Sequence, residues 1–441
     1  MKKHSTNSGN LLWKKAKSLI PGGSMLFSKR AENFLPEKWP AYFSRAKGCL
    51  IWDLDDNKYT DMSLMGVGTN ILGYCNEFVD SAVIETVYSG VASTLNCPEE
   101  VELAEKLIEM NPWSDMVRLA RTGGEINAVS IRIARAATAR DKIALCGYHG
   151  WHDWYLSTNI NSNALKDLLL PGLEPKGVPK SLEGTTLPFV YNDIESLKLI
   201  FEQHKGEIAA VKMEVQRNQP PKNNFLKKVR ELATKNNCVL IFDECTSGFR
   251  ESFGGLHLKY DVEPDLALYS KALGNGYAIS AVVGKAEIME AAQTTFISST
   301  FWTERIGPTA ALATLKEMQK VKSWEYITEM GLYIRERWQD LANTYDLKIN
   351  IWGIPALSGF TFENKNNNLY KTFITQEMMK KKMLAANSIY VSTEHTKEIV
   401  DQYIDNLSRV FEKISLIENE KLNINDCLNS KEAFTGFKRL N

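Results

Sequence analysis

The sequence predicts an α/β protein with a large domain built on a largely parallel β-sheet and a smaller α/β domain beside it. Between about residues 70 and 325, short apolar runs alternate with helix-like segments, a pattern typical of parallel strands covered by helices. Helix and strand patterns also occur on both sides of this region, so we expect the two chain ends to share the smaller domain. With 441 residues and 44% hydrophobic content, the chain is long enough to bury cores of this size.

Apolar runs in the large domain predict buried strands, and one amphipathic segment among them predicts a helix. The strands are Val117 to Ala120, Ile143 to Cys146, Ala209 to Val215, Cys238 to Asp243 and Leu266 to Tyr269, and the helix is Glu125 to Ala139. Parallel strands end at a common edge, where open α/β sheets bind ligands. The polar residues that follow each run are therefore the candidate site residues.

The smaller domain is predicted from short segments near each end. Gly48 to Met62 has the pattern of a β-hairpin with its turn at residues 55–57. In the second half, Leu357 to Phe362 predicts a strand between two helices, Trp324 to Asn343 and Gln376 to Asn387. The expected divisions are 1–69 for the N-terminal segment and part of the small domain, 70–325 for the large domain, 326–417 for the rest of the small domain, and 418–441 for a polar, exposed tail.

Composition excludes several classes of function. The 53 basic residues balance the 53 acidic ones, which disfavours nucleic acid and anionic membrane as partners. The sequence contains no run of roughly 18 apolar residues, so it predicts no membrane span. The first 23 residues become amphipathic, with Leu12, Ala16, Leu19 and Ile20 at helical spacing, and do not resemble an export signal. Seven scattered cysteines without a CxxC pair favour a reducing cytoplasm.

Two candidate site segments follow the first two predicted strands. Thr122, Gly123 and Gly124 open a helix, where backbone N–H groups and the helix dipole could hold a phosphate; an ordinary strand-to-helix turn is the alternative. Tyr148 could stack on a planar cofactor or be a surface aromatic. His149 and His152 have a spacing compatible with zinc, but no third ligand cluster accompanies them, so we expect no metal site.

Two more candidates follow later strands. Asp243 and Glu244 end an apolar run, and a buried carboxylate needs a positive partner such as the protonated nitrogen of a pyridinium cofactor. The alternatives are that the carboxylate caps a helix or forms an ion pair with Arg250. Lys271 comes just after the last predicted strand, where burial could make it a Schiff-base nucleophile, although an isolated lysine is usually a surface residue. A phosphate turn, an aromatic residue, an acid and a lysine thus follow in order, each at the end of a strand.

These residues resemble the class III aminotransferases of pyridoxal 5'-phosphate (PLP) fold type I, particularly the branch that contains glutamate-1-semialdehyde 2,1-aminomutase. The similarity covers nearly the whole chain. It includes the segments Pro21-Gly22-Gly23, RAKGCLIWDLDDNKYTDM, CPEEVELAEKL, SIRIARAATARDKI, Tyr148-His149-Gly150, Tyr191-Asn192-Asp193, FDECTSGFR and Ser270-Lys271. The resemblance implies a large domain with a mostly parallel seven-stranded sheet.

The resemblance also implies roles for individual residues. Lys271 would form the Schiff base with PLP and then move the proton between substrate and cofactor, with Asp243 and Tyr148 as the other catalytic residues. Residues implied to contact the cofactor are Thr122, Gly123, Gly124, Tyr148, His149, Glu214, Asp243, Cys245, Lys271 and Thr300. Thr300 would reach the phosphate from a partner subunit, which implies a homodimer with shared active sites.

Some residues depart from the family pattern. Gly124 stands where the family usually has a threonine, and Trp151 follows Gly150 where a histidine is common. The arginine near the N-terminal Pro-Gly-Gly segment is replaced in register by Lys29, with Arg30 one residue on, so the residue that binds the substrate carboxylate stays open. We therefore expect an aminotransferase that moves an amino group from an amino acid to a small or sugar-like carbonyl compound. Alternatives are the 2,1-aminomutase, a racemase or epimerase, and a non-catalytic binding protein.

Overall fold

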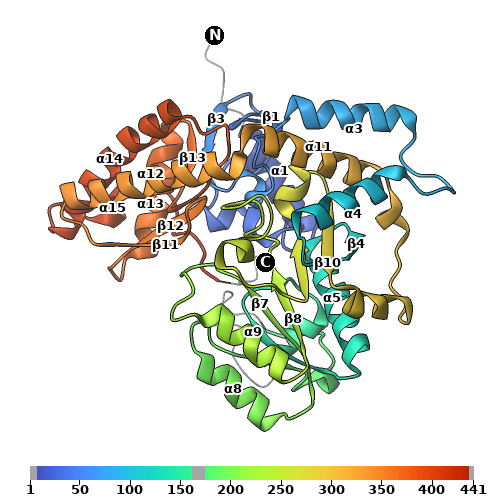
Figure 1. The fold of residues 1–441 in the computed structure, drawn as a ribbon. Coiled ribbons are helices and arrows are strands. Elements are labelled where there is room, and N and C mark those ends of the chain that lie inside the picture. Colours follow the sequence, from blue (N-terminus) through green and yellow to red (C-terminus); the bar gives the residue numbers. More distant parts are fainter. Residues whose placement is uncertain (1–6, 161–173, 437–441) are drawn as a thin grey trace. The chain divides into compact units, whose positions relative to one another are not determined.

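The computed structural model describes residues 7–160 and 174–436. The chain forms two compact units, one made of Met1–Asn76 and Tyr326–Asn441 and the other of Glu77–Glu325 (Figure 1). The first unit thus contains both chain ends, and the second is a single continuous stretch. Within the described residues, no helix combines the length and the apolar character needed to cross a lipid bilayer.

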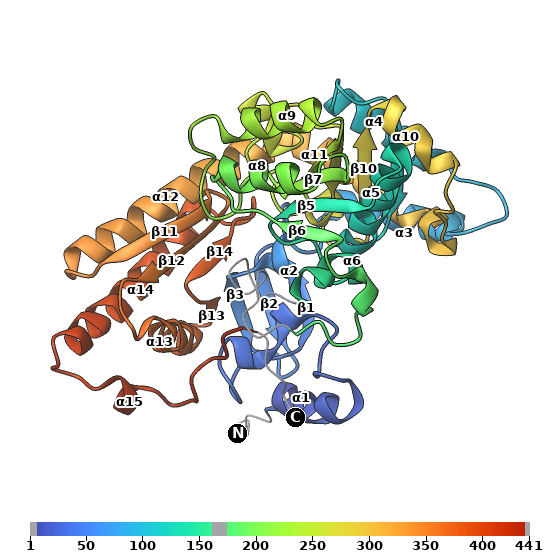
Figure 2. The ribbon, with the colours of Figure 1, turned by 90° about the horizontal axis from the view of Figure 1, so that it is seen from below.

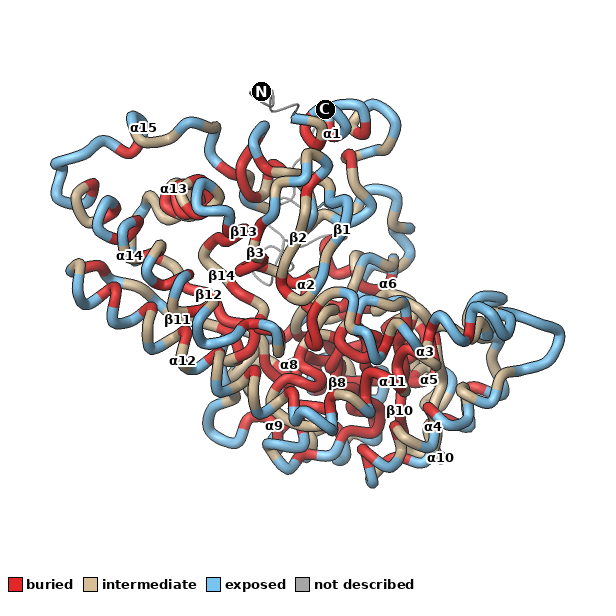
Figure 3. Tube along the Cα trace, turned by 90° about the horizontal axis from the view of Figure 1, so that it is seen from above, coloured by how far each residue is buried: buried red, intermediate tan, exposed pale blue. Residues whose placement is uncertain are grey.

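The continuous unit is built around a seven-stranded sheet. Its strands, in spatial order, are β4 (Met116–Ala120), β10 (Ser280–Gly284), β9 (Leu266–Tyr269), β8 (Val239–Asp243), β7 (Ile208–Glu214), β5 (Lys142–Cys146) and β6 (Thr186–Pro188). Strand β10 is antiparallel to both of its neighbours, and the other pairs are parallel. This confirms the expected mostly parallel sheet. Every residue of β7 to β10 is buried, which explains their continuous apolar runs (Figure 3).

Helices cover this sheet. They are α3 (Glu77–Ser89), α4 (Pro98–Met110), α5 (Gly123–Thr138), α6 (Asp153–Leu156), α8 (Ile194–Gln203), α9 (Phe225–Lys235), α10 (Ala286–Met289) and α11 (Ile306–Val321). Helix α5 packs against five of the strands and buries Ile126, Val129 and Ile133, which lie on one helical face. Helix α11 packs on α3 and α4. The crossover helices therefore fix the strand ends that carry the candidate residues.

The other unit joins the two ends of the chain through small sheets (Figure 2). One sheet contains β1 (Phe43–Lys47), β2 (Leu50–Asp53), β3 (Lys58–Met62) and β13 (Met383–Ala385), and the other contains β11 (Ile349–Ile354), β12 (Leu357–Phe362) and β14 (Ser388–Tyr390). Its helices are α1 (Ser8–Leu19), α2 (Met65–Gly68), α12 (Ser323–Thr344, from its fourth residue), α13 (Asn367–Lys380), α14 (Lys397–Glu418) and α15 (Ile424–Cys427). The antiparallel pairing of β2 with β3 confirms the predicted hairpin.

The predicted helix Gln376 to Asn387 is wrong in its second half. Helix α13 ends at Lys380, and Lys382 has a left-handed backbone with φ 59°. Residues Met383–Ala385 then form β13, which pairs in parallel with β3. Pairing with a strand more than 300 residues earlier overrides a helical pattern that continues through the local sequence.

The apolar face expected for the first helix is also only partly correct. Leu12 and Leu19 are 40% and 68% exposed, whereas Ala16 is buried. The buried face instead contains Trp13, whose indole N–H donates to Glu32 Oε1 at 3.0 Å. The large indole ring, rather than the leucines, sets which side of α1 faces the core. The first six residues lie outside the described part of the chain.

The polar tail after α14 is attached to the rest of its unit. Most side chains from residue 419 to residue 436 are exposed, as expected. However, Ser430 Oγ donates to the Pro36 carbonyl at 2.9 Å, and the N–H of Phe434 donates to the Glu32 carbonyl at 2.8 Å. Ala433 is buried between them. The tail therefore links the last residues of the unit to its first ones; residues 437–441 lie outside the described part.

Candidate active site

The predicted site residues lie in the continuous unit, and all of them except Thr300 are at the carboxyl edge of its sheet. Strands β4, β5, β7, β8 and β9 run in the same direction, so the residues that follow them meet at one edge. These are the turn that opens α5, the loop after β5, Glu214, Asp243 and Lys271. The fold thus brings together groups that are up to about 150 residues apart in sequence.

The amino end of α5 forms an anion cradle. Thr122 caps the helix: its hydroxyl accepts the N–H of Glu125 at 3.3 Å, and the Glu125 carboxylate accepts the N–H of Thr122 at 2.8 Å. Within residues 7–160 and 174–436, no hydrogen bond occupies the N–H of Gly123 or Gly124. The cradle therefore presents two backbone donors and the positive end of a helix dipole.

The loop after β5 crosses this cradle with the help of two glycines. A Cβ on Gly150, which has φ 101°, would lie 3.2 Å from the Cα of Gly124. A Cβ on Gly147 would lie 2.7 Å from Glu214 Oε2, and that carboxylate also accepts the N–H of Tyr148 at 3.1 Å. Side chains at either glycine would push the loop away from the sheet edge. The loop is thereby held where the Tyr148 ring can reach a ligand above the cradle.

Asp243, at the end of β8, is a buried carboxylate with two fixed partners. Its Oδ2 lies 2.7 Å from His149 Nδ1, and its Oδ1 accepts the N–H of Cys245 at 3.0 Å. The other ring nitrogen of His149 faces the Cys146 carbonyl at 3.0 Å, so a protonated ring can donate to both. Burial alone would raise the pKa of Asp243, but the hydrogen bond from His149 and the charges of His149 and Lys212 hold it below its ordinary value. Asp243 is therefore an anion ready to bind a cationic ring N–H.

Lys271 lies two residues beyond β9 in an unfavourable backbone conformation. Its φ is 47°, in the left-handed region that non-glycine residues avoid, and such strain is concentrated at functional positions. Its Nζ donates to Thr246 Oγ1 at 2.7 Å. Burial, and then the positive charge of Arg217, lower the pKa of Lys271 from its ordinary value. A lowered pKa increases the fraction of neutral amine, which is the nucleophilic form.

The remaining predicted residues fall into two groups. Cys245 is buried beside the cradle, 3.8 Å from the point that a Cβ on Gly123 would occupy. Burial raises its pKa well above the ordinary value, so its thiol is neutral. Thr300, in contrast, is exposed at the start of a short 3₁₀ turn (Thr300–Thr303), and no hydrogen bond within the described residues joins its side chain to the cradle.

Comparison with known proteins identifies the family. The aminotransferase class-III family model matches residues 35–411. The chain belongs to the class III aminotransferases. Among curated relatives, 3-aminobutyryl-CoA aminotransferase of Cloacimonas acidaminovorans is 33% identical over 93% of this chain and 97% of its own. Glutamate-1-semialdehyde 2,1-aminomutase of Ruminiclostridium cellulolyticum is 31% identical over 93% of this chain and 99% of its own.

Solved structures agree on the fold. FumI of Sphingopyxis sp. MTA144, in its PLP-bound form, has a TM-score of 0.84 at 24% identity and covers 95% of this chain and 99% of that one. An omega-transaminase of Sphaerobacter thermophilus has a TM-score of 0.82 at 23% identity, covering 93% of this chain and 98% of that one. This class III aminotransferase is a PLP-dependent enzyme with the fold type I architecture expected from the sequence.

The residues present in this aminotransferase fit PLP. The cradle of Gly123 and Gly124 suits a phosphate, the Asp243 carboxylate suits a pyridinium N–H, and Lys271 carries an amine whose pKa is lowered. In addition, Nδ1 of His152 is buried without a hydrogen-bond partner among the described residues, which is typical of a site that a polar ligand completes.

Three residues of the aminotransferase site were not recognised from the sequence. The Thr246 hydroxyl accepts a hydrogen bond from the Lys271 amine. Arg217 forms an ion pair with Glu214 at 3.0 Å. Its guanidinium lies 5.8 Å from the centre of the Tyr148 ring. Lys212, on β7, is fully buried under the site and donates to Ser130 Oγ at 3.1 Å. A charged residue inside the apolar run of β7 was a signal that could have identified Lys212.

Lys212 gives a pH-dependent prediction. Burial lowers the pKa of Lys212 from its ordinary value of 10.5 to about 8, although the charges of Asp243 and Cys245 oppose the shift. Between these two pH values the unfolded chain binds more protons than the folded one, so the free energy of unfolding rises with pH. We expect the unfolding free energy of wild type, measured relative to that of Lys212→Met, to increase by up to ~3 kcal/mol as the pH rises across this window. Denaturant unfolding of both proteins at each end of the window measures it; parallel pH curves would contradict it.

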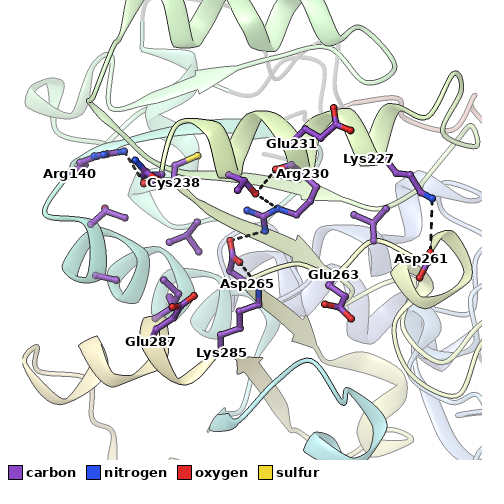
Figure 4. Close-up of a pocket in the computed structure, with 17 residues that line it drawn as sticks. Arg140, Lys227, Arg230, Glu231, Cys238, Asp261, Glu263, Asp265, Lys285 and Glu287 are labelled. Carbon is purple, nitrogen blue, oxygen red and sulfur yellow. Dashed lines mark hydrogen bonds and ion pairs between the residues drawn. The ribbon is translucent and has the colours of Figure 1, made fainter.

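A separate pocket of about 900 Å³ lies at the other edge of the sheet, near the first residues of β8 and β9 (Figure 4). Its central charges pair with one another: Asp265 binds Arg230 at 2.9 Å and Lys285 at 3.2 Å. Across the described ranges, no group of three or more His, Cys, Asp or Glu side chains is placed to hold a metal ion.

Proposed function

We propose that this enzyme transfers an amino group from an amino-acid donor to a small or sugar-like carbonyl acceptor, with Lys271 as the lysine that binds PLP covalently. One observation carries the proposal: the strained Lys271, with its lowered pKa, shares a sheet edge with the anionic Asp243 and the α5 cradle. This combination provides a nucleophilic amine, a counter-ion for a ring nitrogen and an anchor for phosphate.

Each residue is proposed to contribute one step. PLP, when bound, withdraws electrons from the substrate carbon. Asp243 holds the proton on the ring nitrogen, and His149 keeps the carboxylate oriented and anionic. Once a substrate amine has displaced it from PLP, the free Lys271 Nζ would move the proton between the substrate carbon and the cofactor, and Thr246 Oγ1 would hold the amine in place. Tyr148 would cover one face of the ring and exclude water from it.

Arg217 is proposed to face the anionic group of the substrate. Its guanidinium is partly exposed, lies near the Tyr148 ring, and is close enough to Lys271 to lower its pKa. A planar guanidinium can bind a carboxylate through two hydrogen bonds. This placement favours substrates with a negative charge near the reacting amine, which includes amino acids. The similarity to 3-aminobutyryl-CoA aminotransferase makes a 3-amino acyl thioester a second substrate to test.

We further propose that the enzyme works as a homodimer in the cytoplasm. Large apolar side chains are exposed on the continuous unit, including Tyr88 at 88%, Leu95 at 82% and Phe301 at 73%. A partner surface that covered these side chains would remove their apolar area from water. Thr300 lies next to Phe301. If a second subunit covers this region, the Thr300 hydroxyl of one subunit can reach the phosphate site of the other. The seven cysteines are all free thiols, which suits a reducing compartment.

The test of this function is the visible absorption spectrum of the purified enzyme before and after addition of L-glutamate. We expect a band of lysine-bound PLP that is lost as the amino form of the cofactor appears. A band that responds only to 3-aminobutyryl-CoA would move the substrate assignment to thioesters. If neither compound moved the band, transamination of these donors would be excluded and aminomutase or racemase activity would be assayed. Failure to bind PLP at all would contradict the proposal.

A further inference from the structure

The imidazole of His152 lies directly on the first turn of α5. The point that a Cβ on Gly124 would occupy is 3.0 Å from His152 Cε1 and 3.1 Å from His152 Nδ1. The indole ring of Trp151 stacks on the imidazole, with ring centres 4.4 Å apart and an interplanar angle of 25°. The absence of a side chain at Gly124 therefore creates the space that this ring fills, and Gly124 itself carries one of the two free N–H groups of the cradle.

His152 Nδ1 has no evident structural task there. The atom is buried and lacks a hydrogen-bond partner in residues 7–160 and 174–436, although leaving a buried polar atom unpaired is costly. Burial lowers the pKa of His152, despite the opposing charges of Glu125 and Asp153, so the ring is mostly neutral at physiological pH and can carry one N–H. A ligand at the cradle would give that nitrogen a partner.

The cradle also needs a further donor. The hydroxyl of Thr122 is already used by the helix cap, and Gly124 offers none. The Glu125 carboxylate lies in the same turn and repels an arriving dianion; its Oε1 is held by the Trp302 indole at 3.3 Å. Within one subunit, two backbone N–H groups would thus have to hold a phosphate against a neighbouring negative charge.

We propose that His152 is a third phosphate donor, with Nδ1–H donating to a phosphate oxygen of PLP and Trp151 holding the imidazole in place. This inference rests on the proposed function and adds to it a side-chain contact from the same subunit, whose cradle otherwise offers only backbone groups. The phosphate group of PLP, rather than its ring, is the part that His152 recognises. Removing His152 should therefore weaken binding of the phosphorylated cofactor selectively.

The experiment compares the dissociation constants of PLP and of pyridoxal, which lacks the phosphate, by equilibrium titration. For His152→Ala we expect the constant for PLP to rise about tenfold or more, and that for pyridoxal to stay within about twofold. His152→Asn, whose amide nitrogen falls near the Nδ1 position, should keep most of the affinity, whereas His152→Gln, which mimics Nε2, should not. The ³¹P resonance of bound PLP should shift in His152→Ala.

A double substitution supplies an internal control. Gly124→Thr alone would crowd the imidazole and weaken PLP binding, but together with His152→Ala its hydroxyl should occupy the vacated space and restore much of the lost affinity. Unchanged PLP affinity and ³¹P shift in His152→Ala, or equal losses for PLP and pyridoxal, would overturn the inference. If wild type itself formed no band with PLP, the proposed function would fail first, so the two failures are distinguishable.

Discussion

Replacing Lys271 with alanine is expected to abolish covalent attachment of PLP and all detectable transamination. The Lys271 amine is the proposed nucleophile, because its pKa is lowered and Thr246 holds it at the sheet edge. Borohydride reduction followed by peptide mass spectrometry provides the measurement. The wild-type peptide that contains Lys271 should gain the mass of the reduced cofactor, and the variant protein should gain none.

Lys212 makes this experiment discriminating. It is a fully buried lysine on β7, which β8 separates from β9, and its pKa is also lowered, to about 8. Its Nζ, however, donates a hydrogen bond to Ser130 Oγ on helix α5. The variant Lys212→Met is therefore the matched control, and it should retain the reduced cofactor on Lys271. Cofactor found on Lys212 in either protein would show that the nucleophile had been assigned to the wrong lysine.

Replacing Asp243 with asparagine is the second change with a large expected effect. Asparagine matches the shape of aspartate but carries no charge, so the ring nitrogen of PLP would lose the anion that keeps it protonated. We expect the rate of the half-reaction with an amino donor to fall on the order of a hundredfold or more, because this electrostatic contribution acts mainly in the transition state. Stopped-flow absorbance measures the rate.

The control for this change is Glu244→Gln at the neighbouring position. Glu244 accepts the backbone N–H of His257 at 2.9 Å and lies 2.9 Å from its ring Nδ1, so its change should affect the melting temperature more than the half-reaction rate. Asp243→Asn should show the opposite pattern. Near-normal turnover in Asp243→Asn, with PLP bound, would remove Asp243 from the catalytic residues.

The strand ends of the large domain could be predicted from the sequence because each of them is set by local chemistry. The runs that form β8 and β9 are continuously apolar, which predicts that both strands are buried. The polar residues that follow, Asp243 in one case and Ser270-Lys271 in the other, mark where each strand ends. The same reasoning failed for β13, whose strand state depends on pairing with β3 at the other end of the chain. A local pattern contains no information about such a partner.

The site shows the same division. Asp243 and Lys271 were identifiable because their residue types and positions are unusual after apolar runs. Thr246 and Arg217 were not identifiable, since threonine and arginine are ordinary residues in loops, and His152 was considered only as a possible zinc ligand. The folded structure shows that these three side chains lie beside an amine, a ring and a helix end. The structure therefore adds the residues that surround the reacting groups.

The attachment of the C-terminal tail has a consequence for biosynthesis. The unit formed by residues 77–325 is contiguous, so all of its contacts become available once that stretch has left the ribosome. The other unit requires β13 to join β3 and residues 430–434 to bind Glu32 and Pro36, which are made at opposite ends of translation. At about 5–20 residues per second, the first segment waits many seconds for its partners. Most of the buried cluster around Trp13 comes from residues 13–59, but Leu384, which completes it, is made much later. During that interval the part of the cluster that Leu384 covers is exposed, and chaperones can bind the nascent N-terminal segment there.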